Sequence, residues 1–150
     1  MRMLKNVLQK NRNSGCGPAV VATLAGIAYE AGRMMMFPDG RTRDLGSDYR
    51  LLRLALTRLN IEFGPKTERA SVWGEITGLA VVSCTRTGQW HHWVVYDPES
   101  QIVYDPYYPD PTPVLFSRQR PLSFLRVTLP DEPIPAAVIK MRPRRRAEKP

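Results

Sequence analysis

The stretch NSGCGPAVVATLAG, from Asn13 to Gly26, places one of the chain's two cysteines between two glycines and ahead of small apolar residues. Pro18 is tolerated in the first turn of a helix, because its missing N–H would have no partner there. The residues after it, AVVATLAGIAYEAG, are apolar on almost every side, which predicts a buried helix that ends at Gly32. Cys16 would then lie at the N-terminal end of that helix. Unpaired N–H groups and the positive end of the helix dipole stabilise a thiolate there.

The length and charge of the chain set limits on its class. A chain of 150 residues can form one domain with its own core, and we expect this domain to cover residues 1–141. The formal net charge is +8 and the pI is about 9.9, which favours contact with acidic partners but carries no information about the fold. Many of these charges lie in KMRPRRRAEKP, and we expect residues 142–150 to be a disordered basic tail.

Other features bear on the compartment. The opening MRMLKNVLQKNRNSG has no apolar core of the kind that signal peptides carry, and no apolar run approaches the ~20 residues of a membrane helix. We therefore expect a cytoplasmic protein without membrane insertion. Two cysteines are too few for a disulfide framework, which favours a reduced pair.

Helical patterns fill the first half of the chain. After a loop at residues 34–46, Ser47 or Asp48 can cap a helix through SDYRLLRLALTRLN. Its apolar residues recur at helical spacing and its arginines occupy the other face, which predicts packing on a core. They are Leu51, Leu52, Ala55, Leu56 and Leu59.

Strand patterns fill the second half. Three short β-rich runs, separated by turn residues, predict an antiparallel meander at residues 78–85, 91–97 and 101–106. FLRVTL and AAVIKM, at residues 124–129 and 136–141, are interpreted as edge or closing strands. Helices followed by a sheet predict an α+β domain.

The two histidines of the chain are adjacent and begin one of these β-rich runs. Because neighbouring side chains of a strand point to opposite faces, at most one of His91 and His92 can meet Cys16. The next run, QIVYDP, carries Asp105, and two antiparallel strands joined by a short turn would place it beside His92. A carboxylate that accepts from one ring nitrogen leaves the other for the thiol, as in nucleophile–base–acid triads. Asp97 is the alternative acid, although Asp-Pro also favours a turn.

The motifs GCGPAVVATLAG, HHWVVYD and IVYDP resemble those of the papain-like cysteine peptidases, and most of all the branch that trims double-glycine leader peptides from bacteriocins. The resemblance covers the chain from Gln9 to Pro106. It implies a papain-like α+β fold, with the nucleophile at a helix N-terminus and helices packed on an antiparallel sheet. It gives Cys16 the place of the nucleophile and Asp105 that of the orienting acid. His92, directly before WVVY, takes the place of the base better than His91.

The same family has a glutamine shortly before the cysteine, whose amide donates to the oxyanion. The resemblance gives this place to Gln9, with Asn11 or Asn13 as alternatives, and backbone N–H groups near Cys16 can also donate.

Other readings of the cysteines remain open. Cys16 can be a buried structural thiol, the usual state of a free cysteine. Cys84 ends an apolar run, so we expect it in the core. A zinc site of Cys16, Cys84 and a histidine would lack the closely spaced ligand pairs that such sites use, and we expect no metal, no cofactor and no Cys16–Cys84 disulfide.

Two functions follow from these residues. The first is a cysteine peptidase or related thiol acyl-transfer hydrolase acting on a peptide, isopeptide or other amide substrate. Deamidation and transglutamination use the same triad, so the sequence does not separate them. The leader-peptide substrate is not carried over, because these residues include no transporter. The second is an inactive papain-like binding protein that contacts an acidic protein or nucleic acid through RPRRR in its tail.

Overall fold

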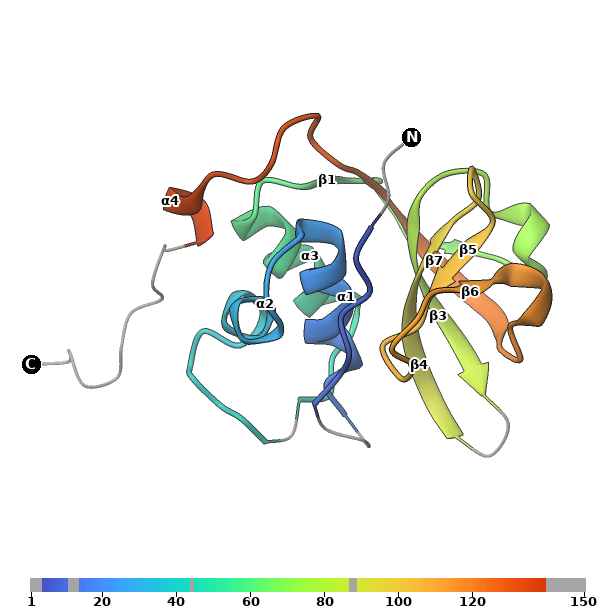
Figure 1. Ribbon diagram of the computed structural model, residues 1–150, viewed down its shortest axis with the longest axis horizontal. Helices are drawn as coiled ribbons and strands as arrows, with labels where there is room; N and C mark the ends of the chain where they lie inside the picture. Colours follow the sequence, from blue (N-terminus) through green and yellow to red (C-terminus); the bar gives the residue numbers. More distant parts are fainter. Residues whose placement is uncertain (1–3, 11–13, 44, 87–88, 140–150) are drawn as a thin grey trace, which may run out of the picture.

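A computed structural model describes residues 4–10, 14–43, 45–86 and 89–139 of the chain. For Arg86, Gln89–His91 and Ala136–Ala137 it describes the backbone only. Three helices form one layer and an antiparallel sheet forms the other (Figure 1). The expected disordered tail at residues 142–150, the candidate donors Asn11 and Asn13, and the expected turn at residues 87–88 lie outside the described residues. Within the described ranges, no helix combines the length and the apolar character that crossing a bilayer requires.

The segment expected to be one helix from Ala19 to Gly32 forms two, so that prediction is wrong. α1 spans Cys16–Ala25 and α2 spans Tyr29–Met36. Gly26 has φ 68° and ends α1, because glycine enters the left-handed region at little cost. Gly32 lets the two helices approach closely: a Cβ there would lie 2.6 Å from the Pro18 carbonyl oxygen. The small apolar residues continue past Gly26, so the apolar pattern did not mark this break.

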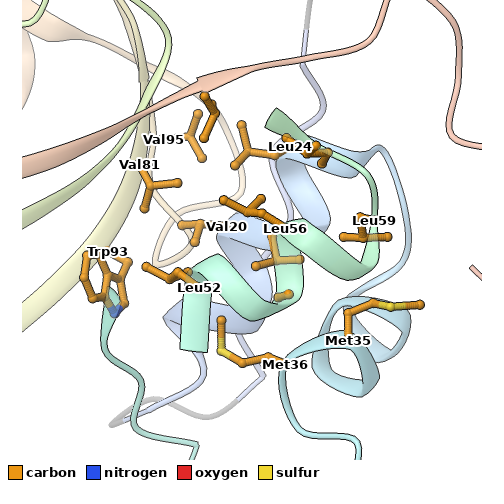
Figure 2. Close-up of a cluster of buried hydrophobic side chains, with 14 of the residues drawn as sticks. Val20, Leu24, Met35, Met36, Leu52, Leu56, Leu59, Val81, Trp93 and Val95 are labelled. Atoms are coloured by element: carbon orange, nitrogen blue, oxygen red, sulfur yellow. The ribbon is translucent and has the colours of Figure 1, made fainter. Parts of the chain in front are cut away.

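α3 spans Tyr49–Arg58 and confirms the predicted amphipathic helix. The Asp48 carboxylate caps it by accepting from the Leu51 N–H at 2.9 Å. Leu52 and Leu56 have no exposed surface and face the sheet layer (Figure 2).

The sheet has the order β1-β7-β3-β4-β5-β6, with β2 also paired to β7. The strands are β1 Glu62–Phe63, β2 Glu68–Arg69, β3 Ala80–Arg86, β4 Gln89–Asp97, β5 Ile102–Tyr104, β6 Thr112–Pro113 and β7 Arg120–Thr128. β3, β4 and β5 are successive antiparallel neighbours, which confirms the predicted meander. Two short 3₁₀ helices, η1 Trp73–Glu75 and η2 Val114–Phe116, lie in the connections.

The strand expected at residues 124–129 is present within β7, but its place in the sheet differs from an edge. β7 is not an edge strand, because it pairs with β3 on one side and with β1 and β2 on the other. The segment expected as a further strand at residues 136–141 begins with a short helix, α4, at Ala136–Ile139. Pro135 accepts from the Val138 N–H at 3.0 Å and starts this turn, which the apolar composition alone did not distinguish from a strand.

Two apolar clusters cover the two faces of the sheet. The helix-facing cluster includes Val81, Trp93 and Val95 (Figure 2), and the other includes Val82, Val94 and Tyr96. From Trp93 to Tyr96, odd-numbered residues of β4 therefore lie against the helices and even-numbered ones lie on the opposite face, as a strand requires. Trp93 packs edge-on against Tyr49 with ring centroids 4.8 Å apart, so it belongs to the core.

Candidate functional site

Cys16 is the first residue of α1, as the sequence predicted. Gly15 precedes it as the N-cap with φ 91°, a conformation that glycine adopts readily, and no side chain caps the helix. The first N–H groups of α1 thus remain available beside the thiol. Both cysteines of the chain are free, and the Cys16 side chain is half-buried. The thiol therefore lies at the positive end of a helix with part of its surface open to a ligand.

His92 and Asp105 form a buried pair. β4 and β5 are antiparallel with Val95 opposite Tyr104, so Asp105, directly after β5, lies beside the middle of β4, two residues along the strand from His92. His92 Nε2 lies 2.6 Å from Asp105 Oδ1, and the two side chains are only 6% and 4% exposed. Since an ionised carboxylate can only accept, Nε2 carries a proton in the neutral and in the charged ring, and Nδ1 is left for another partner. The structure thus joins two of the residues singled out from the sequence.

Cys16 is also close enough to His92 to influence its charge. Burial, the largest single influence, lowers the pKa of His92, because it disfavours the imidazolium. Hydrogen bonds to Asp105 and then to Cys16, together with the negative charges of both groups, outweigh burial and raise this pKa to about 9. A pKa of about 9 makes His92 an imidazolium at neutral pH.

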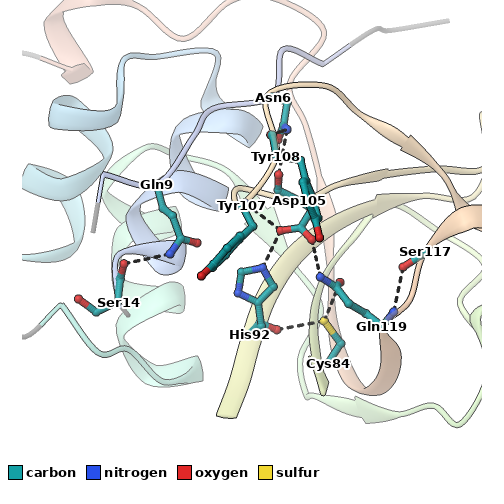
Figure 3. A network of polar contacts seen from close by, with 10 residues as sticks. All are labelled: Asn6, Gln9, Ser14, Cys84, His92, Asp105, Tyr107, Tyr108, Ser117 and Gln119. Carbon is teal, nitrogen blue, oxygen red and sulfur yellow. Dashed lines mark hydrogen bonds and ion pairs between the residues drawn. The ribbon is translucent and has the colours of Figure 1, made fainter. Parts of the chain in front are cut away.

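Further groups hold the Asp105 carboxylate in place (Figure 3). The Tyr107 backbone N–H donates to Oδ1 at 2.9 Å, and the Gln119 side-chain amide donates to Oδ2. The Tyr107 ring packs edge-on against His92 with centroids 5.9 Å apart. Asn6 Nδ2 donates to the Asp105 backbone carbonyl at 3.0 Å. Asp105 therefore has partners on both oxygens and on its main chain.

The sequence analysis did not identify Gln119, Tyr107 or Asn6. Tyr107 could have been inferred from the sequence, because this residue follows Asp105-Pro106 in a turn. Gln119 lies directly before β7, in the polar run SRQR, and nothing local to that run marks it as a partner of Asp105. Only the pairing of β7 with β3 brings it to the site.

Gln9 lies between the acid and the nucleophile segment. Its backbone N–H donates to the Pro106 carbonyl at 2.9 Å, and its side-chain amide donates to the Ser14 carbonyl at 3.3 Å. Figure 3 shows Gln9 on the side of His92 nearest to Ser14, where α1 is about to begin. The Gln9 side-chain amide thus lies at the N-terminal end of α1, the helix that begins with Cys16.

The other candidates occupy different places. Asp97 accepts from the Glu99 N–H and the Ser100 hydroxyl, both at 3.0 Å, as a turn residue does. His91 lies in β4, and its side chain is outside the described part of the chain. Cys84 is fully buried, which confirms that it is a core residue. In the described ranges, no three His, Cys, Asp or Glu side chains gather as a metal site would require.

Comparison with known proteins defines the fold. No family model matches the chain, and no curated protein does. Among solved structures, the chain is similar to the peptidase domain of Streptococcus ComA, a bi-functional ABC transporter involved in a quorum-sensing pathway. The TM-score is 0.59 at 17% identity, over 84% of this chain and 98% of that domain. The α+β architecture expected from the sequence is confirmed, and the chain shares the fold of that peptidase domain.

Proposed function

We propose that this protein is a cysteine peptidase or related thiol acyl-transfer hydrolase, with Cys16 as nucleophile, His92 as general base and acid, and Asp105 as the orienting carboxylate. The observation that carries the proposal is the buried 2.6 Å contact between His92 Nε2 and Asp105 Oδ1. This contact leaves the other ring nitrogen for a thiol at the start of a helix, the arrangement that activates a nucleophilic cysteine.

The proposed reaction has two stages. The Cys16 thiolate attacks the carbonyl carbon of an amide, and the C–N bond breaks as His92 Nδ1 passes its proton to the leaving nitrogen. The product is a thioester between the Cys16 sulfur and the acyl group. His92 then takes a proton from water, the hydroxide attacks the thioester carbon, and the thiolate leaves. Asp105 accepts from Nε2 throughout and keeps the ring oriented.

Stabilisation of the oxyanion is assigned to two sources. The uncapped N–H groups at the start of α1 lie next to the nucleophile, where negative charge develops on the carbonyl oxygen. The Gln9 amide is the proposed side-chain donor, because its Nε2 already reaches the Ser14 carbonyl at the entrance to α1. It would exchange this partner for the oxyanion.

We propose a peptide or isopeptide as the substrate class. Support comes from the fold that the chain shares with a peptidase domain. A primary amide or an amine acceptor in place of water would give deamidation or transglutamination at the same residues.

The test combines a probe with turnover. A peptidyl vinyl sulfone should alkylate Cys16 and leave the fully buried Cys84 unmodified, as peptide mapping by mass spectrometry would show. Mixtures of unstructured peptides should be cleaved by the parent protein. They should stay intact with Cys16→Ala or His92→Ala, while His91→Ala should retain cleavage.

Two results would overturn the proposal. One is equal labelling of both cysteines or of neither, which would favour a binding protein on the same fold. The other is amide hydrolysis that persists in Cys16→Ala.

A further inference from the structure

A chain of buried hydrogen bonds continues behind Asp105 on the side away from His92. The Cys84 sulfur lies 3.1 Å from Gln119 Oε1 and 3.2 Å from the His92 carbonyl oxygen, and Gln119 Nε2 donates to Asp105 Oδ2 (Figure 3). Cys84 has no exposed surface and Gln119 is 6% exposed. Two residues that the proposed chemistry does not use are therefore linked directly to its carboxylate.

The orientation of the Gln119 amide follows from its two neighbours. Asp105 Oδ2 can only accept, so it must face the NH₂ group of the amide. The amide oxygen then faces the Cys84 thiol, whose one proton has this oxygen and the His92 carbonyl as its two acceptors. A flipped amide would place its oxygen against the carboxylate and its NH₂ against the thiol, losing the hydrogen bond to Asp105. Carboxylate and thiol thus select a single orientation of the amide.

The main chain of Gln119 is also fixed. Its N–H donates to the Ser117 hydroxyl at 3.3 Å, and its carbonyl accepts from Trp73 Nε1 at 3.3 Å. Gln119, Ser117 and Asp105 line a cavity of about 410 Å³ that opens between β5, β6 and η2. Truncation of the Gln119 side chain would let water from this cavity compete for Oδ2.

We propose that Gln119 is a positioning residue of the site: its amide, oriented by the Cys84 thiol, holds Asp105 Oδ2 so that Oδ1 stays on His92 Nε2. The catalytic importance of this residue rests on the proposed function, whereas its effect on His92 does not. Oδ1 also accepts from the Tyr107 N–H. Without a donor on Oδ2, the carboxylate could still turn about its Cβ–Cγ bond. The donor on the second oxygen prevents that rotation.

His92 itself reports on the alignment. The titratable groups that face it are Asp105 and Cys16, and the Tyr107 ring packs on it. Weakening the bond to Asp105 should therefore let burial prevail and lower the pKa of His92. Histidine ring NMR follows this titration without any substrate.

The central experiment compares Gln119→Leu with Gln101→Leu. Leucine has a similar volume but no donor, and Gln101 is an exposed residue in the β4–β5 turn. Gln119→Leu should lower the midpoint of the His92 titration by about one pH unit, a shift typical of a weakened charged hydrogen bond. Gln101→Leu should leave the midpoint in place. An unchanged or raised midpoint in a folded Gln119→Leu protein would overturn the proposal.

A second pair of variants covers the case in which Gln119→Leu does not fold. Cys84→Ala removes the donor that orients the amide, whereas Cys84→Ser keeps an O–H donor of similar size. The His92 midpoint should fall in Cys84→Ala and stay nearer that of the parent in Cys84→Ser. Equal midpoints in the two variants would show that the thiol does not orient Gln119, and the inference would be wrong.

The outcome can be separated from that of the proposed function. A lowered midpoint together with no amide hydrolysis by the parent would support the positioning role and overturn the peptidase. Hydrolysis that is lost in Cys16→Ala, together with a His92 midpoint that Gln119→Leu does not change, would support the peptidase and overturn the positioning role of Gln119. For a peptidase that cleaves a known peptide, Gln119→Leu should lower kcat about tenfold and leave KM unchanged.

Discussion

Replacing Asp105 by asparagine should convert His92 from a charged to a neutral residue near pH 7.5. Burial opposes the imidazolium, and Asp105 and Cys16 together outweigh it to give a pKa of about 9 in place of 6.5. This difference corresponds to about 3 kcal/mol of preference for the imidazolium. Asparagine keeps the shape and an accepting oxygen but brings no charge, so burial should prevail and the pKa of His92 should fall to about 6.5 or lower. At about pH 7.5 the charged fraction would drop from nearly all molecules to about a tenth.

The assay is a histidine titration by NMR. The chain has two histidines, so two sets of ring signals are expected, and the variant His91→Gln assigns them. Asp97→Asn is the matched control, because Asp97 caps the turn at the other end of β4. A His92 midpoint that stays near 9 in Asp105→Asn would refute the assignment of Asp105 as the partner that charges the imidazole. An equal fall in Asp97→Asn would refute it as well.

Three predictions concern stability. The pKa of His92 is raised above 6.5 in the folded protein, so protonation of His92 contributes up to about 3 kcal/mol to the free energy of unfolding. This contribution is complete below pH 6.5 and is lost as the pH rises through about 9. Urea unfolding at several pH values measures it, and a stability that does not fall over this range would contradict the prediction. Gly32→Ala would place a Cβ 2.6 Å from the Pro18 carbonyl oxygen and should lower the free energy of unfolding by about 1–3 kcal/mol. Gly46→Ala is the control, because its Cβ would have no atom within 4 Å and should change the stability little. Equal melting temperatures of the two variants would contradict this prediction. Asp48→Ala should lower the free energy of unfolding by about 1 kcal/mol through loss of the α3 cap, and an unchanged urea midpoint would argue against it.

The parts of the site that the sequence predicted depend on local rules. Cys16 starts a helix because Gly15 and Pro18 favour that start, and α3 follows its leucine period. Strand alternation and a short turn are enough to bring Asp105 beside His92. Each of these inferences spans about a dozen residues and needs no knowledge of the rest of the fold.

The parts that could not be predicted depend on pairing between distant segments. A residue just before β7 reaches Asp105 only because β7 pairs with β3, and no property of SRQR encodes that pairing. The break at Gly26 has a different cause. Small apolar residues run from α1 through Gly26 into the start of α2, and the left-handed conformation of this glycine ends α1.

The place of β7 also orders events during synthesis. Of the strands in the described residues, β7 is the last to be synthesised, yet it lies inside the sheet, with Val127 paired to Phe63 and Leu125 paired to Val81. A nascent chain that already contains Cys16, His92 and Asp105 still has β3 with one side open. Closing such a long loop is slow compared with forming helices or hairpins. Insertion of β7 brings Gln119 to the carboxylate, so the buried network is completed only in a late step of folding, after nearly all of the described chain has been made.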